Sequence, residues 1–192
     1  MRITAAVAPL PGAPPNAIRA WEEDGVRVVG VHNRPSVMLD LGHPEREVDD
    51  PAIAAAFGAL LDDARPDVVH WHNLHNLGAS LVDEAFARGI PSVFTPHNLW
   101  LLCPTNHLVR GDGTLCDGPS DHGRDCAACI GFPGLGDGYV RRRLELRERV
   151  SSKVGRILAV SEAVRRALVG AGFPEEQVDV VRQAMPATAR IW

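Results

Sequence analysis

Short apolar runs alternate along the chain with stretches in which apolar residues recur at helical spacing. Six runs have the length and composition of buried strands: residues 2–8, 26–31, 66–72, 90–95, 156–160 and 177–182. Runs that are apolar on both faces are typical of central parallel strands, because such strands are covered on both sides. The pattern therefore predicts a sheet that is largely buried.

The stretches between these runs predict helices at 16–24, from Asp50 onward, at 79–88, at 139–154 and from Ser161 to 168. Asp50 and Pro51 are typical of a helix start, since Asp is a favoured N-cap and Pro fits the first helical position. Ile18 and Trp21 give the first helix an apolar face, and we expect Gly25 to end it. Residues 32–49 and 100–138 show no sustained period and are predicted to be loops.

Strands that alternate with helices at this spacing predict right-handed crossovers, and therefore a mostly parallel sheet with helices on both faces. The predicted fold class is α/β, with a single Rossmann-like domain over residues 1–185 and a cysteine-bearing loop insertion at 100–138. Residues 186–192 are expected to form a tail or the start of a linker.

The amino-acid composition and net charge indicate which kinds of binding partner to expect. The 192 residues are 45% hydrophobic and 23% charged, and 20 Lys and Arg residues against 24 Asp and Glu residues give a formal net charge of −4. This balance gives no reason to expect nucleic acid as the main partner. No run approaches the roughly 18 apolar residues of a membrane span, and Pro9 and Pro11 interrupt the amino-terminal apolar run. We therefore expect a cytoplasmic protein without a transmembrane segment.

Ionisable and amide side chains gather where two predicted strands end. The strand at 90–95 leads into His97, which we interpret as the candidate catalytic residue, because ligands bind at the carboxyl ends of strands in open α/β sheets. The neighbouring candidate substrate contacts are His72, Asn73, His75 and Asn98. His70 and His72 share one face of their strand, so they either ligate a metal together or, as we prefer for His70, serve as hydrogen-bonded core histidines.

Four cysteines follow the spacing C-x12-C-x9-C-x2-C in the glycine-rich loop: Cys103, Cys116, Cys126 and Cys129. The CxxC pair brings two thiolates within reach of one metal ion, and the other two can complete a tetrahedral site. We favour structural zinc, because a loop with few apolar residues needs a cross-link to become ordered. Disulfides or unbridged thiols, and an iron–sulfur centre, are the alternatives. His107 and His122 are further candidate ligands.

Four motifs occur in an order that resembles the amino-terminal domain of family 4 glycosyltransferases of the GT-B fold. They are PDVVHWHN at 66–73, GIPSVFTPHNLWLLCP at 89–104, RILAVSEAVRRAL at 156–168 and VDVV at 178–181. The resemblance implies the acceptor-side half of an enzyme that transfers a hexose from a nucleotide sugar to a sugar or a glycosylated small molecule. His97 is then the active-site histidine, and Gly12 and Ser161 join the substrate contacts, although Ser161 suits a plain N-cap equally well. The cysteine loop resembles an insertion found in a subset of that family.

The chain departs from the family pattern at three places. Pro11 to Pro14 occupy the first βα turn, where the family carries adjacent glycines around the position of Gly12. Asn98 stands where the family often has Asp. Residues 182–186 stand where the family enters a carboxyl-terminal domain that binds the nucleotide sugar; we expect that domain in cis or in a partner chain, and this chain alone to be inactive. The alternative is a non-catalytic, stand-alone sugar-binding or scaffold domain with a metal-stabilised cysteine loop.

Five arginines between residues 141 and 149 leave two interpretations open. In the first interpretation, they attract a phosphorylated or lipid-linked acceptor, or they bind the anionic surface of a membrane as a peripheral contact. Otherwise they form a solvated helix face balanced by Glu145 and Glu148, and this is the interpretation we favour.

Overall fold

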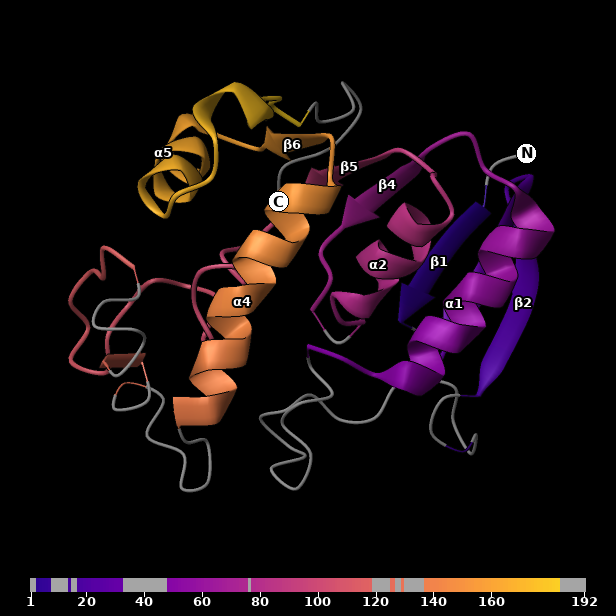
Figure 1. Cartoon of the computed structure of the whole chain (residues 1–192), viewed down its shortest axis with the longest axis horizontal. Coiled ribbons are helices and arrows are strands. Elements are labelled where there is room, and N and C mark those ends of the chain that lie inside the picture. The colour runs from indigo at the N-terminus through magenta and orange to yellow at the C-terminus, as the bar shows by residue number, and fades with distance from the viewer. Residues whose placement is uncertain are drawn as a thin grey trace, which may run out of the picture.

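The computed structural model describes residues 3–7, 14, 17–32, 48–75, 77–118, 125–126, 129 and 137–183. Its strands lie in two hydrogen-bonded sheets flanked by helices (Figure 1). One sheet has the order β1 (Ile3–Val7), β3 (Val26–Val31), β2 (Ile18–Glu23), and the other has the order β4 (Val69–His72), β5 (Ser92–Thr95), β6 (Arg156–Ala159), β7 (Val178–Val180). All neighbours are parallel except β2 and β3. The predicted α/β class with a mostly parallel sheet is confirmed.

The segment at 16–24, predicted as a helix, is instead the edge strand β2, which pairs antiparallel with β3 over its whole length. Asp24 and Gly25 connect the two strands with φ values of 50° and 74°. An Asp-Gly pair with positive φ at both positions is a favoured two-residue hairpin turn. The helix prediction was wrong because it took Gly25 as a helix end and Ile18 as part of a buried face, whereas Ile18 is 50% exposed.

The four parallel strands β4 to β7 are joined by crossovers that carry helices. The chain passes from β4 through α2 (Ser80–Ala87) to β5, from β5 through the cysteine loop and α4 (Asp137–Lys153) to β6, and from β6 through α5 (Glu162–Gly170) and the 3₁₀ turn η3 (Glu175–Gln177) to β7. Parallel strands joined in this way end at the same edge of the sheet. The carboxyl ends of β4, β5, β6 and β7 therefore form one line.

The predicted helix starts are confirmed by their hydrogen bonds. Asp50 Oδ1 accepts the N–H groups of Ala52 at 3.0 Å and Ile53 at 3.2 Å, and Pro51 is the first residue of α1 (Pro51–Ala64). Ser161 Oγ accepts the N–H of Val164 at 3.3 Å at the start of α5. Among the described helices, none is long and apolar enough to cross a bilayer.

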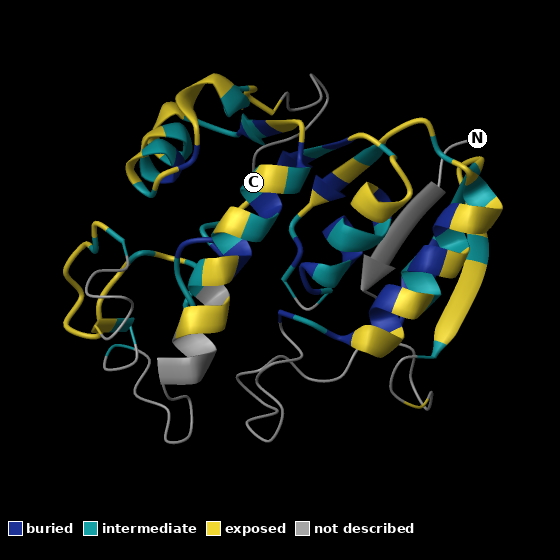
Figure 2. Cartoon of the chain, in the orientation of Figure 1, coloured by how far each residue is buried: buried dark blue, intermediate teal, exposed yellow. Residues whose placement is uncertain are grey.

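The core lies between these helices and the sheets and extends into the start of the cysteine loop (Figure 2). Trp100 is 1% exposed, and Leu101 and Leu102 beside it are also buried. The described part of the loop, 100–118, otherwise consists of turns and an isolated bridge between Val109 and Leu115, so little regular structure forms there, as predicted. The loop thus begins as part of the core. Most of the predicted loop at 32–49, and the predicted tail, lie outside the described residues.

Candidate functional site

The carboxyl ends of β4 and β5 bring three histidines together. His72 lies opposite Thr95 in the parallel register, and His97 follows two residues later. His72 Nδ1 lies 2.9 Å from His97 Nε2, and the two rings are stacked with centroids 5.2 Å apart. The ring centroid of His70 is 4.0 Å from that of His72, and His70 Nε2 lies 2.8 Å from Thr95 Oγ1. His70 thus has the hydrogen bond expected of it, but it is exposed and not part of the core.

Gln183, which follows β7, is a partner of His97 that sequence reasoning missed. Its side-chain Nε2 lies 3.3 Å from His97 Nδ1. An amide NH2 group only donates, so in this orientation His97 Nδ1 accepts and the neutral ring carries its proton on Nε2. That proton points to His72 Nδ1, which accepts it. The hydrogen bonds therefore run in one direction, from Gln183 through His97 to His72.

The surroundings of His70 and His72 favour uncharged rings. Although His70 is exposed, the partial removal of its ring from water lowers its pKa, and the nearby His97 lowers it further. Burial also lowers the pKa of His72, with smaller contributions from His70 and His97. Imidazoles with lowered pKa values are neutral at pH 7 and can both donate and accept hydrogen bonds. The cluster is therefore suited to neutral hydroxyl groups, such as those of a sugar.

Asn73 and Asn98, both predicted substrate contacts, shape the turns that follow β4 and β5. Asn73 has a φ of 58°, and its Oδ1 accepts the N–H of His75 at 3.0 Å. Asn98 Oδ1 accepts the N–H of Trp100 at 3.0 Å. In both turns the Asn side chain holds the backbone two residues further along. The His75 ring lies 6.4 Å from the Trp100 ring, so this histidine is near the turn that starts the cysteine loop.

Two further predicted contacts lie elsewhere on the chain. Ser161 follows the end of β6, where its hydroxyl is the N-cap of α5. Gly12 lies outside the described residues. Their contact with substrate stays a prediction.

The four cysteines line one small cavity in the loop after β5. None of the four is paired in a disulfide. Burial raises the pKa of Cys126 to about 11, and Cys103, Cys116, Cys129 and Asp125 add to the shift. Within the described residues, no group of three or more His, Cys, Asp or Glu side chains is arranged to hold a metal ion, so the structure gives the predicted zinc no formed ligand shell.

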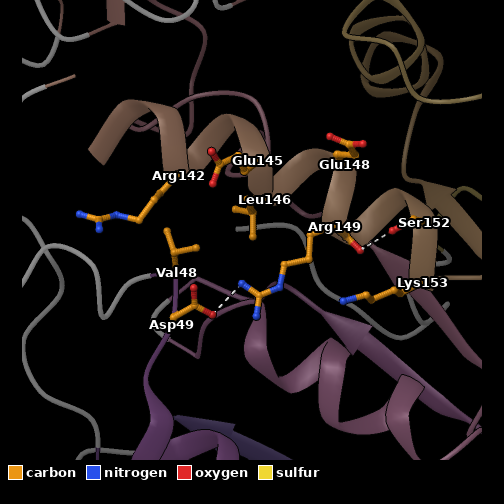
Figure 3. A pocket seen from close by; sticks show the side chains of 9 residues that line it. All are labelled: Val48, Asp49, Arg142, Glu145, Leu146, Glu148, Arg149, Ser152 and Lys153. Carbon is orange, nitrogen blue, oxygen red and sulfur yellow. Dashed lines mark hydrogen bonds and ion pairs between the residues drawn. The ribbon is translucent and has the colours of Figure 1, made fainter. Parts of the chain in front are cut away.

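A second cavity, of about 320 Å³, lies between α4 and the segment that precedes α1 (Figure 3). Arg149 projects from α4 and pairs with Asp49 at 2.7 Å and with Asp83, and Lys153 pairs with Asp83 at 2.6 Å. Burial opposes ionisation of Asp83, but the hydrogen bonds from Arg149 and Lys153 outweigh it and lower the pKa. Glu145 and Glu148 also line the cavity. Arg149 and Lys153 therefore face acidic partners, and none of the predicted catalytic, substrate-contact or metal residues lines the cavity.

Comparison with known proteins identifies one matching family and several solved structures of similar fold. The family model described as Glycosyltransferase Family 4 matches residues 7–185. No curated protein matches the chain. Among solved structures, UDP-GlcNAc 2-epimerase from Neisseria meningitidis bound to UDP-GlcNAc is similar at 16% identity and a TM-score of 0.40, over 67% of this chain and 26% of that chain. UDP-N-acetylglucosamine 2-epimerase from Rickettsia bellii is similar at 12% identity and a TM-score of 0.43, over 93% of this chain and 43% of that chain. The chain thus spans less than half the length of either structure.

Proposed function

The chain belongs to Glycosyltransferase Family 4, and on this basis we propose that it forms the acceptor-side half of an enzyme that transfers a hexose from a nucleotide sugar. The observation that carries the proposal is the contact of His97 with both His72 and Gln183. These side chains lie at the carboxyl ends of β5, β4 and β7. An exposed histidine at this edge occupies the position where ligands bind in open α/β sheets.

We assign His97 to the active site, where its ring positions the sugar beside the reacting carbon. In hexosyl transfer, the acceptor hydroxyl oxygen forms a bond to the anomeric carbon, and the bond from that carbon to the diphosphate breaks. The diphosphate leaves with the electron pair, and the proton of the hydroxyl passes to the departing diphosphate or to solvent. A neutral hydrogen-bonding cluster on the acceptor side contributes orientation. Stabilisation of the leaving diphosphate then falls to the donor side.

The acceptor in this proposal rests against the turns at the ends of the strands. Its contacts are Gly12, His72, Asn73, His75, Asn98 and Ser161. An Asn whose oxygen holds a turn still offers its NH2 group as a donor, so Asn73 and Asn98 can serve both purposes. We place the acceptor among sugars and glycosylated small molecules.

We place the nucleotide sugar mainly on a second GT-B domain, either in cis or in a partner chain. The support is the family pattern, in which the segment equivalent to 182–186 leads into that domain. This chain alone should therefore bind nucleotide sugars weakly or not at all. Calorimetric titration with several nucleotide sugars tests this, and tight binding by the isolated chain would contradict it.

The decisive experiment is His97→Ala in the chain combined with its donor-binding half. We expect transfer to fall by at least about 100-fold, because orientation at the reacting carbon is lost. The circular dichroism spectrum should not change, since His97 is exposed. His107→Ala, which removes an exposed histidine in the cysteine loop, is the matched control and should keep its activity. Wild-type turnover by His97→Ala would remove His97 from the active site.

A non-catalytic sugar-binding or scaffold domain, with the cysteine loop as an interaction surface, is the second candidate. It is favoured by Asn98, which stands where the family often has Asp and whose oxygen is engaged in a turn. Under this alternative, the chain binds a sugar or a partner but supports no transfer with any donor half. Measured transfer would exclude it. Both candidates place the chain in the cytoplasm, as its sequence predicts.

A further inference from the structure

We propose that the loop after β5 binds one zinc ion as a tetrathiolate, with Cys103, Cys116, Cys126 and Cys129 as ligands. The observation behind this inference is that all four cysteines of the chain line the same cavity. The inference does not depend on the proposed function, because it concerns the loop and not the histidine cluster.

Three local structures bring the sulfur atoms to the cavity. Cys103 directly follows the buried segment 100–102, so its backbone is fixed by the core. The N–H of Cys116 donates to the carbonyl of Leu108 at 2.8 Å, which ties the second cysteine to the turn after the first. Cys126 and Cys129 are both described with helical backbone, and both line the cavity. Cysteines from separate parts of the loop therefore line the same cavity.

The size of the cavity restricts what it can hold. Its volume is about 20 Å³. A cavity needs at least about 10–15 Å³ to hold one water molecule, so this one accepts a single body of that size. A sugar ring or a nucleotide is excluded, and the ligand must be an ion or a water molecule.

The type of donor atom around the cavity determines which metal ion it can bind. Mg²⁺ and Ca²⁺ take oxygen ligands, whereas four thiolates in a tetrahedral arrangement are typical of Zn²⁺. Four ionised sulfur atoms around a cavity of this size repel one another, and a divalent cation replaces that repulsion by attraction. Leu102, Pro104 and Leu108 also line the cavity, which limits the access of water to the ion.

One hydrogen bond that could support the site is already formed at Cys103. The Thr105 hydroxyl lies 3.2 Å from the Cys103 sulfur, within hydrogen-bonding distance for a sulfur atom. Hydrogen bonds to a ligand atom are the outer support on which metal sites depend. Within the described residues, no three His, Cys, Asp or Glu side chains are arranged to hold a metal ion, so closure of the four sulfur atoms on the ion is the step that the proposal adds.

The test is the metal content of the purified full chain, prepared with a reducing agent. We expect one zinc per chain and four thiols that become reactive only after chelation. Replacement by Co²⁺ should give the strong absorption of tetrahedral cobalt bound to thiolates. Cys126→Ser should bind less zinc at limiting metal concentration, and circular dichroism checks that its sheets remain folded. If that variant does not fold, the cobalt spectrum of the wild-type chain decides.

Two control variants define the ligand set. His107→Ala and Asp125→Asn change groups in or near the loop that are not ligands in the proposal, so both should retain zinc. Loss of zinc in either variant would overturn the tetrathiolate assignment. A wild-type chain that contains no zinc, that contains iron and sulfide, or that has two disulfides would overturn the site itself. His97→Ala should keep its zinc, so failure of the transfer assay leaves this result unaffected.

Discussion

The histidine cluster and the cysteine loop begin within a few residues of each other but are held in place by different means. His72 and His97 are placed by the register of two paired strands, so their contact is formed by the sheet itself. Cys103 and Cys116 are placed by turns, and their side chains surround a cavity without forming a complete site. Sites on rigid elements are more precisely preformed than sites on loops. In this molecule the paired strands alone bring the histidine side chains into contact. The cysteine side chains, by contrast, need the proposed zinc ion to come together.

Trp100 joins the two regions and should give the largest effect. Trp100→Ala should lower the free energy of unfolding by about 3–5 kcal/mol, because a fully buried aromatic ring is removed from the core. Urea denaturation measures this. Leu115→Ala, at a position in the same loop that is 82% exposed, is the control and should change stability by no more than about 0.5 kcal/mol. If Trp100→Ala weakened zinc binding without lowering the free energy of unfolding, Trp100 would stabilise only the cysteine loop and not the core that the loop shares with the sheets.

Thr105→Val should affect the cysteine loop alone. It removes the hydroxyl that contacts the Cys103 sulfur, and loss of such outer support lowers metal affinity by about 10–100-fold. Competition with a chromophoric chelator gives the affinity. Thr114→Val is the matched control, since the Thr114 hydroxyl donates to Asp112 and not to a cysteine. Equal losses in both variants would mean that the loop responds to any lost hydrogen bond.

In the zinc-free chain, mild acid should affect the histidine cluster, and the effect should be the smallest of the three. The folded-state pKa values of His70 and His72 lie below the ordinary value of 6.5, so the unfolded chain binds protons first as the pH falls. Stability should therefore decrease from pH 7.5 to pH 5.5, and the decrease should be small because both side chains are exposed and solvent screens the shift. Urea denaturation at both pH values measures this decrease in the free energy of unfolding. Compared with the wild-type chain, the decrease should be smaller for His72→Asn and the same for His107→Asn. A stability that does not vary over this range would contradict the lowered pKa values.

The elements that carry the candidate site were predictable because their signals are local. Asp50 and Pro51 mark the start of α1 by side-chain chemistry that needs no distant partner, and the apolar run before His97 places that residue at a strand end. The hairpin was missed although its signal is equally local. Asp24 and Gly25 favour a turn with positive φ. The spacing of Ile18 and Trp21 also fits one face of a helix, and the prediction followed that spacing instead of the turn.

The contact of Gln183 with His97 could not be found in this way. The two residues are 86 positions apart, and β6 lies between β5 and β7 in the sheet. Their contact depends on the strand order and on the path of the chain after β7, and neither is encoded by a local pattern. The cysteine spacing is an intermediate case, because it predicts the set of sulfur atoms but not how closely they gather.

The edge strand β2 also bears on how the molecule behaves in concentrated solution. Within the described part of the chain it pairs only with β3, so its outer edge offers backbone donors and acceptors to a second copy. Arg19, Glu22 and Glu23 are exposed along it, and charged side chains on an edge strand disfavour the addition of another strand. The hairpin that stands where a helix was expected thus carries its own protection against fibre-like growth.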